Sequence, residues 1–332
     1  MARPALKANV MFFGSLLFMV IPTALVLVIG WKSAASLAML AAMGGLFSMM
    51  GLHGRGMILL TIATGVSTFA ASLVSDNPWA SAGLMLLCGA GLGAVNKWGL
   101  SLWNFMFPVL AAAVIADPPK VATGAVPNAL LTAAIAMGCL VAAALLTMLL
   151  VKKPVQTEVK VYPFKVNLMY AVNLGVLLAG AGYFSSVYRH EQLGVWLTLT
   201  IVIILIYPYA GQSTSRAIQR AAGTILGFLV AIGVGASGLP DFLYYAAAFV
   251  FLEIALLMRI TPHKKYWEYV MFLTPGVVLI SGSASDIVAV SHNRLYATIV
   301  AAIACLLVLG IERLMFWRGG LNQHVEVTTA TT

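Results

Sequence analysis

Long apolar stretches separated by short polar or charged segments fill almost the whole chain. A helix needs about 20 mostly apolar residues to cross the hydrocarbon core of a bilayer, and most of these stretches approach that length. We therefore expect an all-α polytopic membrane protein with about 12 transmembrane helices. The predicted spans are residues 9–31, 33–52, 57–75, 79–95, 98–116, 126–151, 166–187, 193–210, 217–238, 242–258, 267–285 and 294–316.

The composition supports this class and excludes several others. Of the 332 residues, 61% are hydrophobic and 9% are charged, whereas soluble domains are about 25% charged. This excludes a soluble enzyme, a nucleic-acid-binding protein and a disordered chain. The histidines and cysteines are scattered, and no Gly-x-x-x-x-Gly-Lys phosphate loop occurs. We therefore expect no enzyme activity, no ATP hydrolysis, no metal site and no cofactor.

The basic residues predict the orientation. With a cytoplasmic N-terminus, 15 of the 19 Lys and Arg residues fall inside, as the positive-inside rule requires. The exceptions are Lys32, Lys120, Arg189 and Arg294. We expect both termini to be cytoplasmic, together with a basic connector at residues 152–165.

The two halves of the chain repeat each other. A shift of 165 residues superposes Trp31 on Trp196, Arg55 on Arg220 and Asp76 on Asp241. We expect two parallel six-helix repeats, related by a pseudo-two-fold axis along the membrane normal. The predicted parts are a first repeat at 1–151, the connector at 152–165, a second repeat at 166–318 and a cytoplasmic tail at 319–332.

Small residues and prolines indicate where helices pack or bend. Gly89 with Gly93, and Gly223 with Gly227, are small-xxx-small pairs that favour close helix packing in lipid. Four prolines inside apolar runs predict kinks or breaks. They are Pro22, Pro108, Pro208 and Pro275.

The densest polar string, residues 207–227, joins the eighth predicted span to the ninth on the cytoplasmic side. Arg216 and Arg220 are four residues apart and share one face at the start of that helix. Free amides, the positive end of the helix dipole and two guanidinium groups favour an organic anion. Gln219 and Thr224 support the predicted site, and Arg55 repeats it weakly in the first half. The alternative is that these arginines only anchor the helix at lipid headgroups.

This string resembles the membrane domain of the fusaric acid resistance and aromatic acid exporter (FUSC) family over about 35 residues. The residues that carry the resemblance are Trp196-Leu197-Thr198, Pro208, Gly211, Arg216, Gln219-Arg220 and Gly223-Thr224-x-x-Gly227. It implies an inner-membrane efflux protein that works with a periplasmic membrane-fusion adaptor. Many members carry a large cytoplasmic domain between their halves. This chain has only its 14-residue connector, so it is similar to a minimal, membrane-domain-only member or a close relative.

Other candidate residues lie within the spans or at their ends. Glu253 lies about 12 residues into the tenth span, and a buried carboxylate there suggests a proton-coupling or substrate-pathway residue. The alternative is a structural ion pair with a basic residue such as Arg220 or Arg259. Trp267 in the second half, and Trp103 with Asn104 in the first, are candidates for a wall against an aromatic substrate. They are also typical of interfacial anchors.

These observations predict an efflux transporter for small organic anions, aromatic carboxylates in particular, in a bacterial inner membrane. Two alternatives stay open: an anion channel or uniporter driven by the membrane potential, and a non-transporting membrane subunit that scaffolds an adaptor. The expected partners are the substrate anion, membrane lipid and the adaptor, with no nucleic acid. The substrate, the coupling ion and any homo-oligomeric state are left open.

Overall fold

A computed structural model describes residues 20–49, 54–98, 104–150, 164–189, 193–206, 210–237, 240–260, 264–281 and 287–316. The part of the chain that it describes is helical, with short connections and no strand. The helices fall into two compact units, one up to Thr198 and one from Leu199 onward. Each unit is described separately below.

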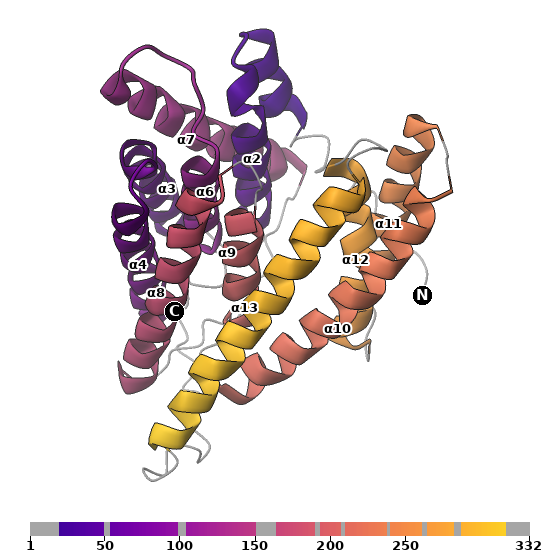
Figure 1. The fold of residues 1–332 in the computed structure, drawn as a ribbon. Coiled ribbons are helices and arrows are strands. Elements are labelled where there is room, and N and C mark those ends of the chain that lie inside the picture. The colour runs from indigo at the N-terminus through magenta and orange to yellow at the C-terminus, as the bar shows by residue number, and fades with distance from the viewer. Residues whose placement is uncertain are drawn as a thin grey trace. The chain divides into compact units, whose positions relative to one another are not determined.

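The first unit is built around one short, buried helix. Its elements are η1 (Lys32–Ala34), α2 (Ala35–Met49), α3 (Arg55–Val74), α4 (Pro78–Val95), η2 (Asn96–Trp98), α6 (Met106–Ala116), α7 (Ala125–Leu150) and α8 (Phe164–Val187) (Figure 1). Nearly every residue of α6 is buried, and α6 contacts α2, α3, α4 and α8. A helix that is apolar on all sides lies in a core, and α6 has that role.

The predicted glycine pair of the first half holds α4 against α8. A Cβ added to Gly89 would lie 2.7 Å from the Cα of Gly175, and one added to Gly93 would clash with Ala171. Asn77 fixes the start of α4, because its Oδ1 accepts hydrogen bonds from the backbone N–H groups of Trp79 (3.0 Å) and Ala80 (3.1 Å). The first predicted small-xxx-small pair is therefore a packing site.

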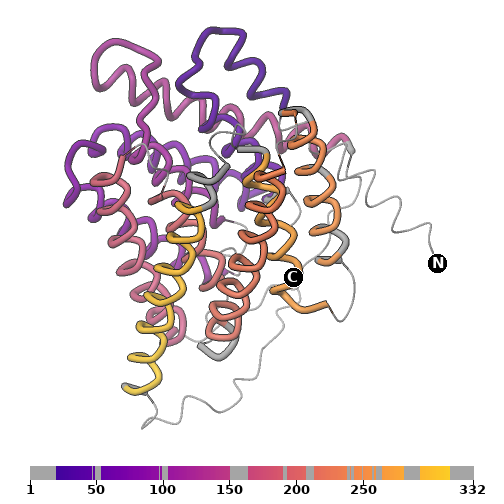
Figure 2. The backbone as a smooth tube through the Cα atoms, turned by 45° about the vertical axis from the view of Figure 1, so that its right-hand side comes forward, coloured from indigo at the N-terminus to yellow at the C-terminus, as the bar shows by residue number. Residues whose placement is uncertain are grey.

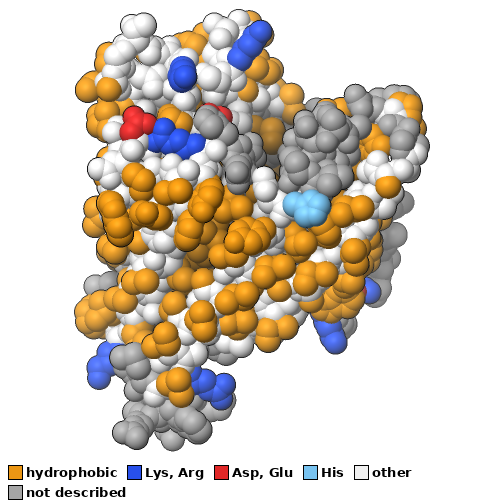
Figure 3. Space-filling view, in the orientation of Figure 1, with side chains coloured by type: hydrophobic (Ala, Val, Ile, Leu, Met, Phe, Trp, Pro, Cys, Tyr) orange, Lys and Arg blue, Asp and Glu red, His pale blue; other side chains and the backbone are white. Residues whose placement is uncertain are grey.

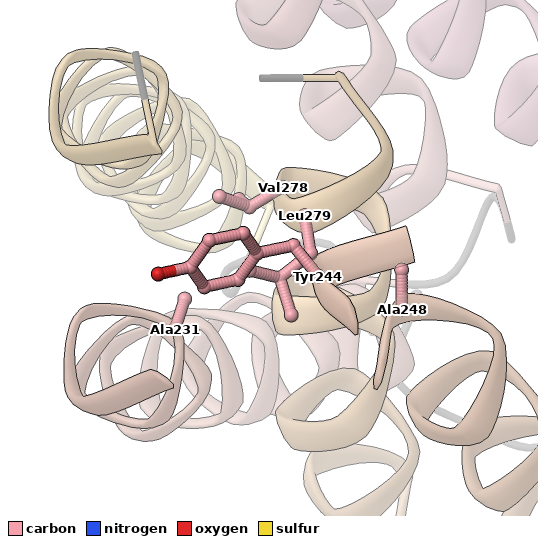
Figure 4. Close-up of a cluster of buried hydrophobic side chains, with 5 residues drawn as sticks. All are labelled: Ala231, Tyr244, Ala248, Val278 and Leu279. Carbon is pink, nitrogen blue, oxygen red and sulfur yellow. The ribbon is translucent and has the colours of Figure 1, made fainter. Parts of the chain in front are cut away.

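Helix α9 (Leu193–Ile204) leads into the second unit, which consists of α10 (Ala210–Gly235), α11 (Asp241–Ile260), α12 (Tyr266–Ser281) and α13 (Ile287–Phe316). Helix α12 contacts α10, α11 and α13, and α13 runs alongside α10 (Figure 2). A buried cluster of Ala231, Tyr244, Ala248, Val278 and Leu279 joins α10, α11 and α12 (Figure 4). The Tyr244 hydroxyl donates a hydrogen bond of 3.1 Å to the carbonyl of Gly235, so even this polar group is satisfied within the unit.

Six helices of the described chain are long and apolar enough to cross a bilayer: α3, α4, α7, α8, α10 and α13. Hydrophobic side chains cover the middle of the helices on the face shown in Figure 3. These features confirm a multi-pass, all-helical membrane protein. The predicted spans from 33–52 onward coincide with helices, although α6 and α9 have only 11 and 12 residues. The total of twelve spans therefore stays a prediction.

Contacts in the two halves run in parallel. In the first half α3 contacts α6 and α7, and in the second half α10 contacts α12 and α13, which hold the corresponding places in the predicted repeat. Likewise, α4 contacts α6, and α11 contacts α12. Helix α8, predicted to open the second repeat, packs on α4 and belongs to the first unit. The compact units divide after residue 198, and the predicted division into repeats at the connector stays a prediction.

The prolines affect the helices less than expected. Pro275 lies inside α12, which continues through it to Ser281. Pro108 occupies the first turn of α6, where a missing N–H removes no helical hydrogen bond. Pro22 lies within a helical stretch at residues 20–28, and Pro208 lies outside the described residues.

Candidate functional site

The predicted anion site lies on α10, where it faces α12. Arg220 is only 3% exposed, and its Nη1 donates a hydrogen bond of 3.0 Å to the Tyr266 hydroxyl at the start of α12. Its Nε is buried and has no hydrogen-bond partner among the described residues. No carboxylate in the described chain forms an ion pair with Arg220. A guanidinium with unused donors in a buried position can accept an anion.

Arg216 lies one turn earlier on the same face of α10 and contacts the ring of Tyr266. Its guanidinium lies 5.2 Å from the centre of the Tyr266 ring, within the range of a cation–π interaction. Tyr266 therefore contacts both predicted arginines, the first through its ring and the second through its hydroxyl. Tyr269, a turn further along α12, has its ring centre 6.0 Å from that of Tyr266.

The side chain of Gln219 connects α10 to the first turn of α12. Its Oε1 accepts a hydrogen bond of 3.3 Å from the backbone N–H of Trp267, and its Nε2 donates one of 2.9 Å to Ser215 Oγ. The N–H of Trp267 belongs to the first turn of α12, where backbone donors lack helical partners. Gln219 thus caps α12 and fixes the position of Tyr266 relative to α10.

The second predicted glycine pair is occupied by a helix backbone. A Cβ added to Gly223 would lie 2.6 Å from the carbonyl oxygen of Trp267, and one added to Gly227 would lie 2.6 Å from that of Met271. The close approach permitted at Gly223 is therefore used by α12 rather than left for a ligand. Thr224, between the two glycines, is 2% exposed.

Arg294 on α13 is a buried cation that the sequence analysis did not select. It is 3% exposed, and Arg220 and Tyr269 are among the groups that interact with it electrostatically. Helix α13 begins at Ile287, so Arg294 lies two turns inside it, whereas the predicted span began at this residue. An Arg close to an apolar run, preceded by His292 and Asn293, was the signal available in the sequence.

The remaining predicted residues are distributed elsewhere. Arg55 is exposed at the first position of α3, and Asn104 is 1% exposed; both lie in the first unit. Trp267 is half-buried in the first turn of α12, next to Tyr266. Trp103 lies outside the described residues. Within the second unit, the structure brings together Arg216, Gln219, Arg220, Thr224 and Trp267.

Glu253 lies well inside α11 and is half-buried. Its Oε2 is buried without a hydrogen-bond partner among the described residues. The alternative ion pair with Arg220 is not formed, since Arg220 donates to Tyr266 instead. The side chain of Arg259 lies outside the described residues.

The site combines positive charge with aromatic surface. Two buried guanidinium groups and a third over a tyrosine ring come from α10 and α13, while α12 supplies two phenols and the edge of a tryptophan. Such an arrangement can bind a carboxylate through charge-assisted hydrogen bonds and hold an attached ring against aromatic side chains.

Comparison with known proteins gives one match. Residues 176–308 match the family model described as fusaric acid resistance protein-like. No curated protein and no solved structure gave a significant match. The matched region contains the whole arginine site, from Arg216 to Arg294, and it supports a membrane-transport role for the chain. Residues 176–308 of this multi-pass membrane protein are therefore similar to the fusaric acid resistance proteins.

Proposed function

We propose that the protein exports small organic anions, and aromatic carboxylates in particular, from the cytoplasm. The observation that carries this proposal is Arg220, a buried guanidinium with a free Nε and a neutral phenol as its hydrogen-bond partner. Burying a charge without a counter-ion is costly, and an anionic substrate would reduce that cost. The adjacent aromatic side chains suit a substrate that carries a ring.

Within this proposal the chain lies in a bacterial inner membrane with both termini in the cytoplasm. Its two halves are parallel six-helix repeats, a view supported by the shared contacts of α3 and α10. Export passes the substrate to a periplasmic adaptor. Glu253 carries the coupling proton, and its buried, unpartnered Oε2 supports that role.

The test is transport into inside-out vesicles, which present the cytoplasmic face to added substrate. Arg220→Lys keeps the charge but loses the two parallel hydrogen bonds that a guanidinium makes to a carboxylate. A charge-assisted hydrogen bond contributes about 1.5–3 kcal/mol, so we expect Arg220→Lys to lower the apparent affinity for benzoate roughly ten- to hundredfold. Arg220→Ala should lower it further.

Two controls make the result specific. Benzamide, which lacks the carboxylate, should respond little to either substitution. Arg313→Lys changes an exposed arginine of α13 and should leave benzoate transport unchanged. Equal losses for benzoate and benzamide would show that Arg220 maintains the fold and does not bind the substrate. Absence of any transport by the wild type would favour the scaffold alternative.

A further inference from the structure

A groove of about 330 Å³ runs between α3 and α7 on the surface of the first unit. The two helices contact each other, and both are long and apolar enough to cross a bilayer. The walls of the groove include Ile58 and Ile62 of α3 and Leu145 and Met148 of α7, each more than half exposed. Ala144 also lines the groove and is buried, so a small side chain lies at its base.

The groove is apolar throughout. Its threonine, Thr61, donates its hydroxyl to the carbonyl of Met57 at 2.8 Å, so this polar group is satisfied within α3. Water gains no hydrogen bonds in such a space, whereas a hydrocarbon chain can fill it and make van der Waals contacts. The groove therefore suits the acyl chain of a lipid.

The position of the groove along the helices also suits an acyl chain. It covers residues 57–62 at the start of α3 and residues 141–148 near the end of α7, which corresponds to about 8–10 Å along the helix axes. Further along α3 the two helices pack closely, because a Cβ added to Gly65 would clash with the side chain of Met137. The groove thus lies at one end of two membrane spans, where the acyl chains of one leaflet begin.

Arg55 places a positive charge at this end of the groove. It is exposed at the first position of α3, and Ile58 and Ile62 follow it by three and seven residues, so all three share one helix face. Among the described residues, no carboxylate forms an ion pair with Arg55. A guanidinium can bind a phosphate group through two parallel hydrogen bonds.

We propose that α3 and α7 form a binding site for one anionic phospholipid, whose acyl chain lies in the groove and whose phosphate binds Arg55. The net negative charge of the lipid complements the guanidinium, whereas a zwitterionic headgroup brings a positive charge of its own. This site is separate from the arginine site on α10 and requires neither a particular substrate nor a direction of transport. Arg55 then serves the lipid and not a second copy of the anion site.

The experiment is native mass spectrometry of the full chain, purified in detergent and mixed with equal amounts of dioleoyl phosphatidylglycerol and dioleoyl phosphatidylcholine. We expect the wild type to retain one phosphatidylglycerol in preference to phosphatidylcholine by at least about fivefold, the effect of one basic residue at an anionic lipid. Arg55→Gln should remove this preference, and Arg55→Lys, which keeps the charge, should retain part of it.

A second substitution tests the groove itself. Ala144→Leu fills its base and should lower phosphatidylglycerol retention at least as much as Arg55→Gln does. Gly138→Leu is the matched control, because it adds the same side chain to an exposed position of α7 where a Cβ meets nothing within 4 Å. It should leave retention unchanged. Since one lipid contacts both Arg55 and Ala144, the double variant should lose little more than the stronger single variant.

The proposal is wrong if the wild type retains both lipids equally, or if Arg55→Gln keeps the preference; neither result depends on whether Ala144→Leu folds. Additive losses in the double variant would also overturn it, because the two residues would then act on different lipids. Glycerol 3-phosphate carries the charge without acyl chains and should compete little. Effective competition by it would assign Arg55 to a free phosphate. A dimer that Ala144→Leu dissociates would assign the groove to a second copy of the chain, and either result would reject the lipid site.

Discussion

At the scale of single residues, the main cost in this chain is ionisable groups inside apolar helices. Glu253 is the most informative of them, because its Oε2 is buried and finds no donor in the described chain. On insertion scales, a charged side chain at the centre of a membrane helix costs about 2.5–3.5 kcal/mol. A carboxylate that is protonated in one state and ionised in another avoids part of this cost. That property suits a proton carrier.

We predict that Glu253→Gln abolishes the dependence of export on a pH gradient while leaving the protein inserted and folded. Glutamine keeps the size and polarity of a protonated glutamate but cannot release a proton. The measurement is benzoate uptake into inside-out vesicles with and without an imposed pH gradient, at a clamped membrane potential.

Glu312→Gln, near the end of α13, serves as the control and should keep the wild-type response. If Glu253→Gln transports with unchanged pH dependence, the carboxylate is structural and the uniporter alternative gains. That alternative is physically sufficient, since expelling one negative charge from a negative-inside cell gains about 2.3 kcal/mol per 100 mV.

The site residues differ in how far the sequence could predict them. Arg216 and Arg220 could be predicted because they interrupt an otherwise apolar pattern at helical spacing. The partner of Arg220 was not, since Tyr266 is 46 positions away and meets it only because Gln219 caps α12. Arg294 was placed at the outer end of its span, because a charged residue next to an apolar run marks a span end in most proteins.

At the scale of elements, helix contacts depend on glycines that admit a neighbouring backbone. We predict that Gly223→Ala destabilises the protein by about 1–3 kcal/mol, the usual cost of overpacking. The added methyl would lie 2.6 Å from the carbonyl oxygen of Trp267, a backbone atom that cannot rotate away. Thermal unfolding in detergent should show a lower midpoint.

Gly233, on the same helix α10, is a matched control. A Cβ there meets nothing within 4 Å, so Gly233→Ala should leave stability unchanged or raise it by up to about 1 kcal/mol through better helix propensity. Equal effects of the two substitutions would mean that α10 and α12 do not approach closely at Gly223. The separation of α12 from α10 should also weaken benzoate binding, since Tyr266 moves with α12.

Hydropathy located the helices well but their ends poorly. Helix α7 (Ala125–Leu150) agrees with the predicted 126–151 within one residue, whereas α13 starts seven residues before its predicted span. A hydropathy pattern responds to apolar side chains, and a helix continues through polar residues such as Arg294 when neighbouring side chains bury them. Helix α6 is shorter than predicted because its apolar character reflects burial among other helices rather than contact with lipid.

At the scale of the whole molecule, the two halves share a contact pattern but differ in charge. By the shift of 165 residues, Arg220 corresponds to Arg55, Glu253 to Cys88 and Arg294 to Ala129. Arg55 is exposed, while Cys88 and Ala129 are buried and uncharged. At these three positions, the buried Arg and Glu side chains therefore lie in the second half alone. If the predicted repeat holds, a transport cycle built on this site is asymmetric.

Whether the protein exports or imports its substrate depends on which side of the membrane the start of α10, with its arginines, faces. We predict that Lys265, in the exposed connection between α11 and α12, is cytoplasmic, and that Lys120 and Ser237 are outside. The measurement uses single cysteines at these positions, in a background where Cys88, Cys139 and Cys305 are replaced by alanine. All three native cysteines are buried, and each replacement removes a single sulfur atom, so the cavity that it leaves is small.

An impermeant thiol reagent applied to intact spheroplasts should label Lys120→Cys and Ser237→Cys, and should label Lys265→Cys only after the membrane is permeabilised. Lys153→Cys in the connector should behave like Lys265→Cys. The reverse labelling pattern would mean that the chain has the opposite orientation in the membrane. The start of α10 and its arginines would then face the outside. The same binding chemistry would then capture anions from outside the cell, and the protein would be an importer.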